Sequence, residues 1–433
     1  MNLSTAFIVF LIIFVLMFIL RMPIPMGMMS ACVFYFLISG DNVKMVGQQT
    51  LKTFYTNYTI IAVPLFIFAA NVMNSGKVTD KVFGFAKCFV GRFKGGLGHV
   101  NVLASLIFSG MTGSAIADAS GLGKMEIDAM RAEGYDDGFS CAITAASATI
   151  GPVFPPSIPM VIYAMLSGAS VGALFMGGMV PGVLLAIALM IYVAFIAHKR
   201  NYPVSARIRG KAFLKYTVTA IPAILTPVIL LVGIYTGIMT PTEAGAVAGL
   251  YALIVAAFGY RVLKWDGLKQ VLLETIKSTG SVSIMIGAAT SISYIVAKEQ
   301  LATKVASWML GVTDNKYVFL LMINVVVLIL GMFIDTSVIQ VVFIPIVLPM
   351  AQAFGVDLVH FGLILVFNMM IGLSTPPFGM LNFITAGVSG TPLKEVIKEI
   401  WAPLIAMLIV LFIITFIPDV VLFLPRLLLG YGG

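Results

Sequence analysis

The chain has 433 residues, of which 60% are hydrophobic and 10% charged, and its mean hydropathy is +1.06. A soluble domain of this length could not bury so much apolar surface, so composition excludes one and predicts a protein with many membrane spans. The formal net charge of +8 does not require a nucleic-acid partner, because the cytoplasmic loops of membrane proteins retain Lys and Arg. The three cysteines lack metal-ligand spacing and are expected to be buried and reduced.

The N-terminal region is predicted to contain three spans. Residues 3–20 and 24–39 are apolar over nearly the length that a membrane helix needs, and the first lacks a cleavage site, so we expect it to be retained. A more polar stretch at 41–55 favours an interfacial helix, and 58–73 is the next span.

A basic surface helix and a hairpin are predicted next. Residues 77–94 combine five basic residues with Phe and Val, which is typical of an amphipathic helix on the cytoplasmic surface. The apolar run 99–108 is too short to cross, and Gly-Met-Thr-Gly-Ser follows it at 110–114. Because basic residues flank both ends of this region, it is predicted to enter and leave the membrane on the cytoplasmic side.

Residues 139–165 are apolar enough to cross a bilayer, yet they contain Thr-Ile-Gly-Pro-Val-Phe-Pro-Pro-Ser at 149–157. Proline removes a backbone donor and clashes with the preceding turn. In lipid, non-helical backbone survives only inside protein or beside a water-filled cavity. The segment is therefore predicted to be a discontinuous helix whose break marks a buried site.

The second half is predicted to repeat this order after a long span at 170–197 and a basic link at 198–216. We expect spans at about 216–237 and 240–260, a surface stretch at 261–277, a span at 279–297, a hairpin with its tip near 331–337, a second broken helix at 359–388 and a final span at about 401–424.

Three anchors repeat at one offset, which indicates a duplicated unit. Gly110-Met111, Gly151 and Pro155-Pro156 recur 221 residues later as Gly331-Met332, Gly372 and Pro376-Pro377. The first unit, 1–200, is expected to comprise scaffold spans at 1–75, a hairpin and broken helix at 95–167 and a span at 170–198; the second, 201–433, scaffold spans at 214–297, a hairpin and broken helix at 316–388 and a final span at 400–424.

Charge distribution predicts the orientation. An odd number of crossings separates the two units, so the second is predicted to be upside down relative to the first. With the N-terminus outside, 20 of the 26 Lys and Arg residues lie inside, including the link at 198–216. The fold class predicted is an all-α polytopic membrane protein with an inverted repeat.

The hairpin tips and helix breaks supply candidate ion ligands. Asp335 lies in a hydrophobic stretch, where a carboxylate indicates a functional site, and Ser114 is its equivalent at the same offset. Hydroxyls, a carboxylate and freed carbonyls suit a small hard cation, and we predict sodium rather than a transition metal. The predicted sodium-binding residues are Gly110, Thr112, Ser114, Thr149, Gly151, Gly331, Asp335, Thr336, Gly372 and Thr375.

Free N–H groups at the half-helix N-termini favour an organic anion beside the cation. The predicted substrate-binding residues are Pro156, Ser157, Lys298, Ser337, Ser374 and Pro377.

Structural alternatives remain open for several of these residues. A Ser or Thr in a membrane helix often bonds only to its own turn, Lys298 is placed to snorkel, and Asp118 is favoured to pair with Lys124. Asp136-Asp137 is interpreted as a solvated helix start.

Other function classes find little support. No phosphate-binding glycine loop with a lysine is found, so ATP is not expected to drive the chain directly, and no cofactor is predicted. The rivals are a self-sufficient sodium/dicarboxylate carrier or ion antiporter and, remotely, an intramembrane prenyl or lipid transferase, although the three histidines are scattered.

The motifs at 110–118, 150–159 and 373–379 resemble the signature regions of the large, DctM-like membrane subunit of tripartite ATP-independent periplasmic (TRAP) transporters. The resemblance covers essentially the whole chain and is greatest to sialic acid systems. It implies a sodium-driven importer of carboxylate-bearing solutes and not an enzyme, with an elevator-like fold in which hairpins and broken helices move against a scaffold. It also implies a separate four-helix membrane subunit, a soluble periplasmic binding protein and a place in the bacterial inner membrane.

Overall fold

The computed structural model describes residues 4–20, 22–56, 58–74, 78–205, 208–301, 303–305, 311 and 313–432, and all regular structure in this part is helical. Seven of the described helices are long and apolar enough to cross a membrane. The all-α membrane fold is therefore confirmed. Arg21, Lys77 and Arg207, which the predicted topology places inside, lie outside the described residues.

The N-terminal helices form where they are predicted. Helices α1 (Thr5–Ile19) and α2 (Ile24–Ser39) pack against each other. Gly40 ends α2 in the left-handed conformation, where its N–H bonds to the Phe36 carbonyl. The polar helix α3 (Lys44–Thr56) is bent by 78° from the segment formed by η1 (Tyr58–Ile61) and α4 (Ala62–Asn74).

The basic segment and the first hairpin follow. The basic segment forms α5 (Val78–Val90), which packs against α6 (Gly96–Thr112), the first arm of the hairpin. The tip turns at Gly113, whose φ of 59° favours glycine, and the return arm consists of α7 (Ala115–Gly121) and α8 (Gly123–Ala132). Ser114 caps α7 by accepting a hydrogen bond from the Ala117 N–H.

Both discontinuous helices are broken at their proline pairs. The first comprises α9 (Asp137–Ala148) and α10 (Ile158–Ser167), and the second α18 (Leu358–Ser374) and α19 (Met380–Ser389). The peptide bond between the paired prolines is cis in both breaks.

The second hairpin also has its tip where it is predicted. Its arms are α16 (Lys316–Phe333) and α17 (Thr336–Ala353). Asp335 caps α17 by accepting a hydrogen bond from the Ser337 N–H at 2.9 Å.

The long helices differ from the prediction at two places. Helices α11 (Val171–Lys199), α12 (Lys211–Tyr235) and α13 (Pro241–Ile254, continued by η2, Val255–Gly259) form as expected. The expected surface stretch 261–277 and the span after it instead form one helix, α14 (Trp265–Lys298), because no proline interrupts these residues. The last span is α20 (Leu393–Phe416), which ends before Pro418, and a separate helix, α21 (Asp419–Leu429), packs against α11.

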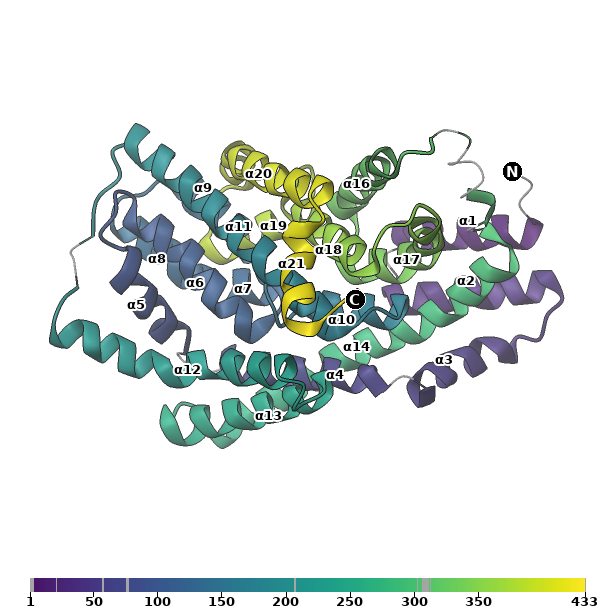
Figure 1. Cartoon of the computed structure of the whole chain (residues 1–433), viewed down its shortest axis with the longest axis horizontal. Helices are drawn as coiled ribbons and strands as arrows, with labels where there is room; N and C mark the ends of the chain where they lie inside the picture. The colour runs from purple at the N-terminus through teal and green to yellow at the C-terminus, as the bar shows by residue number, and fades with distance from the viewer. Residues whose placement is uncertain are drawn as a thin grey trace.

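The helices pack in two groups. One contains α1–α5 and α12–α14; the other contains the hairpins, the broken helices, α11, α20 and α21 (Figure 1). The groups meet where α4 packs against α6 and α10, where α14 packs against α17, and where α5 and α12 pack against α6. Within the second group, α10 contacts α17 and α19 contacts α7 and α8, so each broken helix touches the hairpin of the other half.

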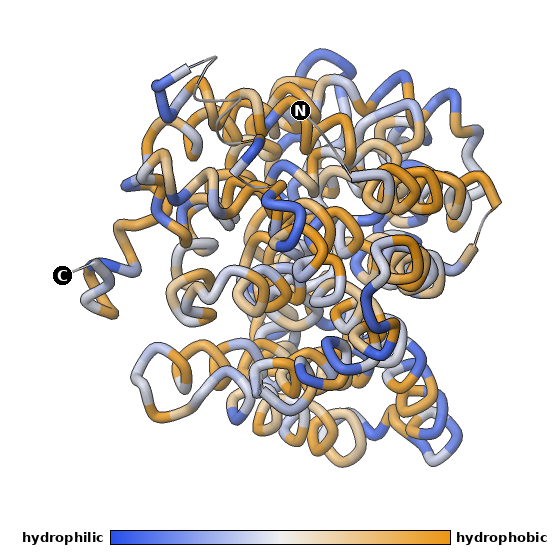
Figure 2. Tube along the Cα trace, turned by 90° about the vertical axis from the view of Figure 1, so that its right-hand side faces the viewer, coloured by the Kyte–Doolittle hydropathy of each residue, from blue (hydrophilic) through white to orange (hydrophobic). Residues whose placement is uncertain are grey.

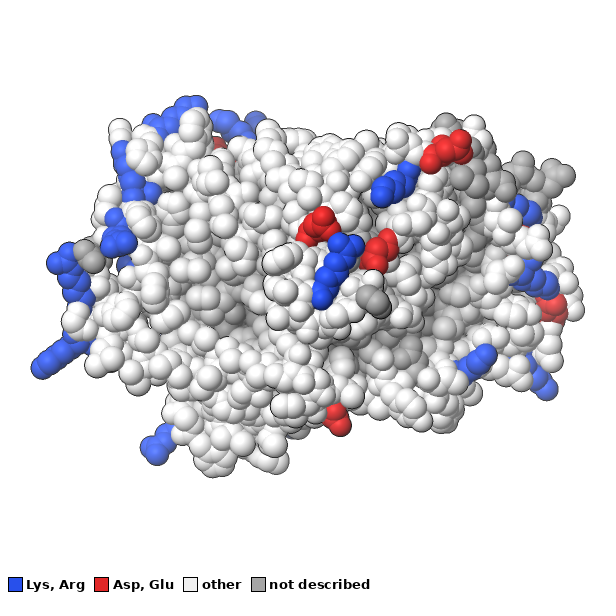
Figure 3. Space-filling model, viewed as in Figure 1, with Lys and Arg blue, Asp and Glu red and all other residues white. Residues whose placement is uncertain are grey.

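Apolar residues follow most of the helices, and polar residues gather mainly at turns (Figure 2). On the face seen in Figure 3, Lys and Arg gather at the left-hand end, over the ends of α5, α11 and α12. The N-terminus lies at the opposite end (Figure 1). Cys32 and Cys141 are buried, Cys88 is half-buried, and all three are free.

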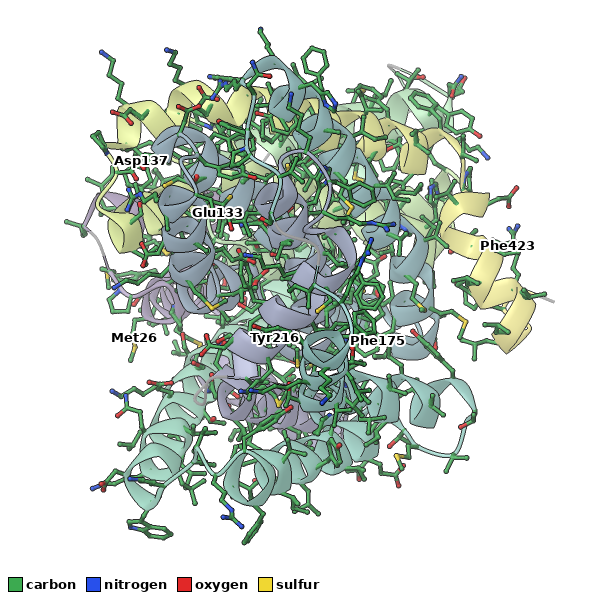
Figure 4. All side chains as sticks on the ribbon, turned by 90° about the vertical axis from the view of Figure 1, so that its left-hand side faces the viewer. Met26, Glu133, Asp137, Phe175, Tyr216 and Phe423 are labelled. Atoms are coloured by element: carbon green, nitrogen blue, oxygen red, sulfur yellow. The ribbon has the colours of Figure 1, made fainter. Side chains whose placement is uncertain are left out.

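The basic end is held together by ion pairs. Figure 4 views this end and labels Glu133 and Asp137, which pair with Lys87 and Arg131 respectively. Arg131 also donates to the Ser389 carbonyl at 2.7 Å and to Thr391, which joins the first hairpin to the second broken helix.

Asp136 and Asp137 begin α9 as predicted, but they are not simply solvated. Arg200 pairs with Asp136 and binds both carboxylate oxygens of Glu399, at 2.9 and 2.8 Å. The Tyr202 hydroxyl donates to Asp136, and this hydrogen bond, with help from Arg200, lowers the pKa of that carboxyl.

Candidate ion and substrate site

The first hairpin tip packs directly on the first helix break. A Cβ atom at Gly113 would lie 2.5 Å from the Pro156 carbonyl oxygen, and one at Gly151 would lie 3.4 Å from the Ser114 carbonyl carbon. The Ile158 N–H donates to the Gly113 carbonyl at 3.4 Å. Glycine at the tip therefore permits backbone-to-backbone contact between the two irregular segments.

The second tip meets the second break through another pair of glycines. A Cβ atom at Gly372 would lie 2.6 Å from the Gly331 Cα atom, so α16 and α18 approach each other with no side chain between them. The arrangement places Asp335 and Thr336 at the tip, close to where α18 ends at Ser374. The pairing of tips with breaks inferred from the repeat is thus present in both halves.

A cavity of about 730 Å³ brings the two tips together. Its size suits a small organic ligand, because such pockets usually measure about 300–1,000 Å³. Five of the predicted site residues line it: Thr112 and Ser114 from the first tip, and Asp335, Thr336 and Ser337 from the second. Residues far apart in the sequence therefore share one cavity.

Two hydroxyls in this cavity are buried without a partner. The Oγ1 atoms of Thr112 and Thr336, on side chains that are 2% and 5% exposed, accept and donate no hydrogen bond. Burying a polar atom without a hydrogen-bond partner costs free energy. A bound ligand that supplies the missing partner would explain why such an atom is present. These two residues are the best candidates for direct ion or substrate contact.

The hydroxyls at the helix breaks are already engaged. Thr149 donates to the Ala146 carbonyl at 2.5 Å, and Thr375 donates to the Ile371 carbonyl at 2.7 Å. This is the bonding to the helix's own turn that the sequence left open as the alternative. Each oxygen nevertheless keeps lone pairs that could face a cation.

The remaining predicted residues are absent from the lining of this cavity. Ser157 donates to the Pro152 carbonyl, and Ser374 donates to the Ala145 carbonyl at 3.4 Å, which connects α18 to α9. Gly110 and Pro156 line a smaller neighbouring void, and Gly331 lines a third. Lys298 forms an ion pair with Asp41; neither Lys298 nor Pro377 lines the large cavity.

The opposite wall of the cavity was not predicted. Asn71 of α4 and Lys277, Ser278 and Ser281 of α14 all line it. Asn71 donates to Thr275 at 3.0 Å, which ties α4 to α14 at this level. The serines three residues apart were a usable signal, because that spacing places both on one helical face.

The favoured pairing of Asp118 with Lys124 is wrong. Lys124 is exposed, whereas Asp118 is 2% exposed and neither carboxylate oxygen has a hydrogen-bond partner. Glu126, an acid that the sequence did not single out, is also buried and accepts from the Asn101 amide at 2.8 Å. Asp118 on α7 is buried and Lys124 on α8 is exposed, a difference that nearness in sequence conceals.

The atoms at the hairpin tips that could bind an ion are mostly hard oxygen atoms. Among the described residues, no group of three or more His, Cys, Asp or Glu side chains is placed to hold a metal ion. The ligands offered at the tips are hydroxyls, carbonyls and the Asp335 carboxylate, which suit a small hard cation.

Comparisons with known proteins agree with this architecture. The family model for the "Tripartite ATP-independent periplasmic transporter, DctM component" matches residues 10–420. The chain is 41% identical over 412 residues to the "Sialic acid TRAP transporter large permease protein SiaM" of Vibrio cholerae, covering 95% of this chain and 96% of that protein. It is 39% identical over 426 residues to the Haemophilus influenzae "Sialic acid TRAP transporter permease protein SiaT", covering 98% of this chain and 69% of that protein.

A solved structure shares the fold at low identity. The YdaH transporter of Alcanivorax borkumensis superposes with a TM-score of 0.68 at 13% identity, covering 90% of this chain and 89% of that one. The family match spans both hairpins and both broken helices. The chain therefore belongs to the DctM family, the large membrane subunits of TRAP transporters.

Proposed function

We propose that the chain is the permease subunit of a sodium-coupled importer of an organic acid, with sialic acid as the first candidate. One observation carries the proposal: both hairpin tips line a single cavity of about 730 Å³ with hydroxyls, a carboxylate and two unpartnered threonine oxygens. The two relatives named for sialic acid, at 41% and 39% identity, support the choice of substrate.

Sodium binds at the two places where a tip meets a break. Gly110, Thr112, Ser114, Thr149 and Gly151 surround the first, and Gly331, Asp335, Thr336, Gly372 and Thr375 surround the second. Hydroxyl and carbonyl oxygens replace part of the hydration shell of the ion, and Asp335 supplies a negative charge at the second place. The organic acid occupies the cavity between them, beside Ser337.

The membrane potential supplies the driving force. Moving one elementary charge through 100 mV is worth about 2.3 kcal/mol. Two or more sodium ions carried with one monovalent anion therefore give a net inward drive. The ion and the anion also reduce each other's cost of leaving water.

The two helix groups act as the parts of an elevator. The group with both hairpins and both broken helices carries the cargo, and the group with α4, α12, α13 and α14 is the scaffold. The crossed contacts, α10 with α17 and α19 with α7 and α8, support treating the carrier as one body built from two inverted units. The cavity is lined by both groups, as transfer of a bound solute along a scaffold requires.

The protein resides in a bacterial inner membrane, with its N-terminus periplasmic and its 198–216 connection cytoplasmic. The gathering of Lys and Arg at the end opposite the N-terminus supports this orientation (Figure 3). It works with a small four-helix membrane subunit and a periplasmic protein that delivers the substrate. It is not an enzyme.

Uptake into proteoliposomes tests the proposal. The full chain is reconstituted with its small membrane subunit, and a panel of radiolabelled acids (sialic acid, succinate, malate) is offered with the binding protein present or absent. Sodium-dependent uptake of sialic acid that needs the binding protein is expected. Uptake without sodium, or of no acid in the panel, contradicts it. Uptake of succinate alone would favour a dicarboxylate carrier, which the 37% identity to the Pseudomonas aeruginosa "C4-dicarboxylate TRAP transporter large permease protein DctM" makes the second candidate.

A further inference from the structure

Lys277 occupies an unusual place for a lysine of α14. It lies about three turns into the helix and lines the large cavity, opposite the hairpin tips. Lys277 and Asp335 are the charged residues that line this cavity in the described part of the chain. The first is a cation carried by the scaffold group, and the second is an anion carried by the hairpin group.

Lys277 is not committed to a nearby acid. Several basic residues of this chain form ion pairs, such as Lys87 with Glu133 and Lys298 with Asp41, but none of the described ion pairs includes Lys277. Glu274, one turn earlier on α14, accepts instead from the Gln270 amide at 2.8 Å. The ammonium group is therefore available to a ligand in the cavity.

Two serines of the same helix line the cavity with Lys277. Ser278 and Ser281 line the cavity from the same helix, and Lys277 and Ser281 are four residues apart, which places them on one face. An ammonium with two hydroxyl donors can bind a carboxylate: the lysine supplies charge with little demand on geometry, and the hydroxyls supply direction.

Charge balance within the cavity points the same way. A sodium ion at Asp335 neutralises that carboxylate, so the positive charges of Lys277 and of the sodium ion at the first tip are left over. An anionic solute would offset part of this positive charge, and an uncharged solute would leave all of it unbalanced. Because low-dielectric walls concentrate the field of a charge in a cleft, Lys277 also raises the local concentration of anions.

We propose that Lys277, with Ser278 and Ser281, binds the carboxylate of the transported acid and sets the preference of the cavity for anionic over uncharged solutes. The role rests on the proposed function, which it deepens by naming the residues that select the substrate. It also moves the expected lysine contact from Lys298, which is paired with Asp41, to Lys277.

The test compares Lys277→Gln with Lys269→Gln in the reconstituted full system. Lys269 is exposed on the same helix and does not line the cavity, so it controls for the loss of one charge. Initial rates are measured for sialic acid and for its uncharged methyl ester at constant sodium. Lys277→Gln should raise the KM for the acid at least tenfold and leave kcat within twofold, whereas Lys269→Gln should match the wild type.

The ester shows whether Lys277 contacts the substrate, because a purely structural role would not change the preference for the acid over the ester. The wild type should prefer the acid to the ester, Lys277→Gln should lose most of that preference, and Lys277→Arg should keep it because the charge remains. Raising ionic strength with choline chloride should increase the KM for the acid in the wild type more than in Lys277→Gln.

Failure of the Lys277 role and failure of the proposed function would give different results. If the wild type transports sialic acid and Lys277→Gln has an unchanged KM and an unchanged preference for the acid, the role of Lys277 is overturned while the proposed function stands. If the wild type transports no acid of the panel, the proposed function itself fails. A fall in kcat with no change in preference would also reject substrate binding by Lys277.

Discussion

Gly331 and Gly372 touch through their backbones, and a methyl group on Gly372 would lie 2.6 Å from the Gly331 Cα atom. The contact joins the second hairpin to the second broken helix just before Asp335 and Thr375, two of the candidate ligands. Close helix approach of this kind needs small residues, as is common between helices in membranes. The geometry of the second candidate ion site therefore depends on glycine at both positions.

Gly372→Ala should separate α16 from α18 and reduce sodium-dependent uptake strongly. Overpacking of this kind typically costs about 1–3 kcal/mol, so the melting temperature should also fall. Gly387→Ala is the matched control, because a Cβ there meets no atom within 4 Å. Equal uptake by the two variants would show that the glycine contact does not position the ion site.

Asp335→Asn should weaken the apparent affinity for sodium by tenfold or more. The change removes the charge but keeps an oxygen that can accept the Ser337 N–H, so the cap of α17 survives and the fold should be retained. The measurement is uptake rate against sodium concentration. Ser114→Ala should act in the same direction at the first tip, and wild-type sodium dependence in both variants would remove these residues from the ion sites.

Thr112→Val and Thr336→Val should reduce uptake without lowering the stability of the protein. Each removes a buried hydroxyl without a partner, and replacing such a group by an apolar one of the same shape is nearly neutral or stabilising. Uptake should nevertheless fall, because a ligand loses an oxygen. Thr385→Val is the control: its hydroxyl donates to the Leu381 carbonyl outside the cavity, so uptake should be unchanged. Normal uptake in the Thr112 and Thr336 variants would contradict direct ligation.

A cysteine at Lys211 should be labelled only from the cytoplasmic side. This residue begins α12, just after the basic connection, and it is exposed. The background should carry Cys88→Ser, because Cys88 is the half-buried native thiol. Labelling of intact spheroplasts by a membrane-impermeant maleimide would reverse the predicted orientation.

Tyr202→Phe should destabilise the basic end in a pH-dependent way. The Tyr202 hydroxyl lowers the pKa of Asp136 in the folded protein, so its contribution to stability is present above a pH of about 4 and is lost as the pH falls further. At pH 7 the loss should be about 1 kcal/mol, and it should shrink toward pH 3. Thermal melts across this range, with Tyr251→Phe as control, would measure it; a pH-independent difference would contradict the linkage.

The breaks and tips were predictable because glycine and proline act locally. The proline pairs end a helix whatever surrounds them, so Pro155-Pro156 and Pro376-Pro377 located both discontinuous helices, and the shared offset located both tips. The ligand candidates at the tips followed from the same anchors, and five of them line the cavity.

Features that depend on which way a helix faces were not predictable in this way. The charges at 261–277 indicated a surface stretch, yet residues 265–277 form the first turns of a continuous α14, and the cavity position of Lys277 follows from how that helix packs. Asp118 lacks the expected lysine partner for the same reason. Whether a threonine bonds to its own turn, as Thr149 does, or stays free, as Thr112 does, depends on rotamers that composition does not fix.

Arg131 connects the two predicted units at the basic end. Its guanidinium holds Asp137 of the first unit together with the Ser389 carbonyl and Thr391 of the second. The first hairpin and the second broken helix are therefore tied together at this end, and neither can shift relative to the other unless these bonds break.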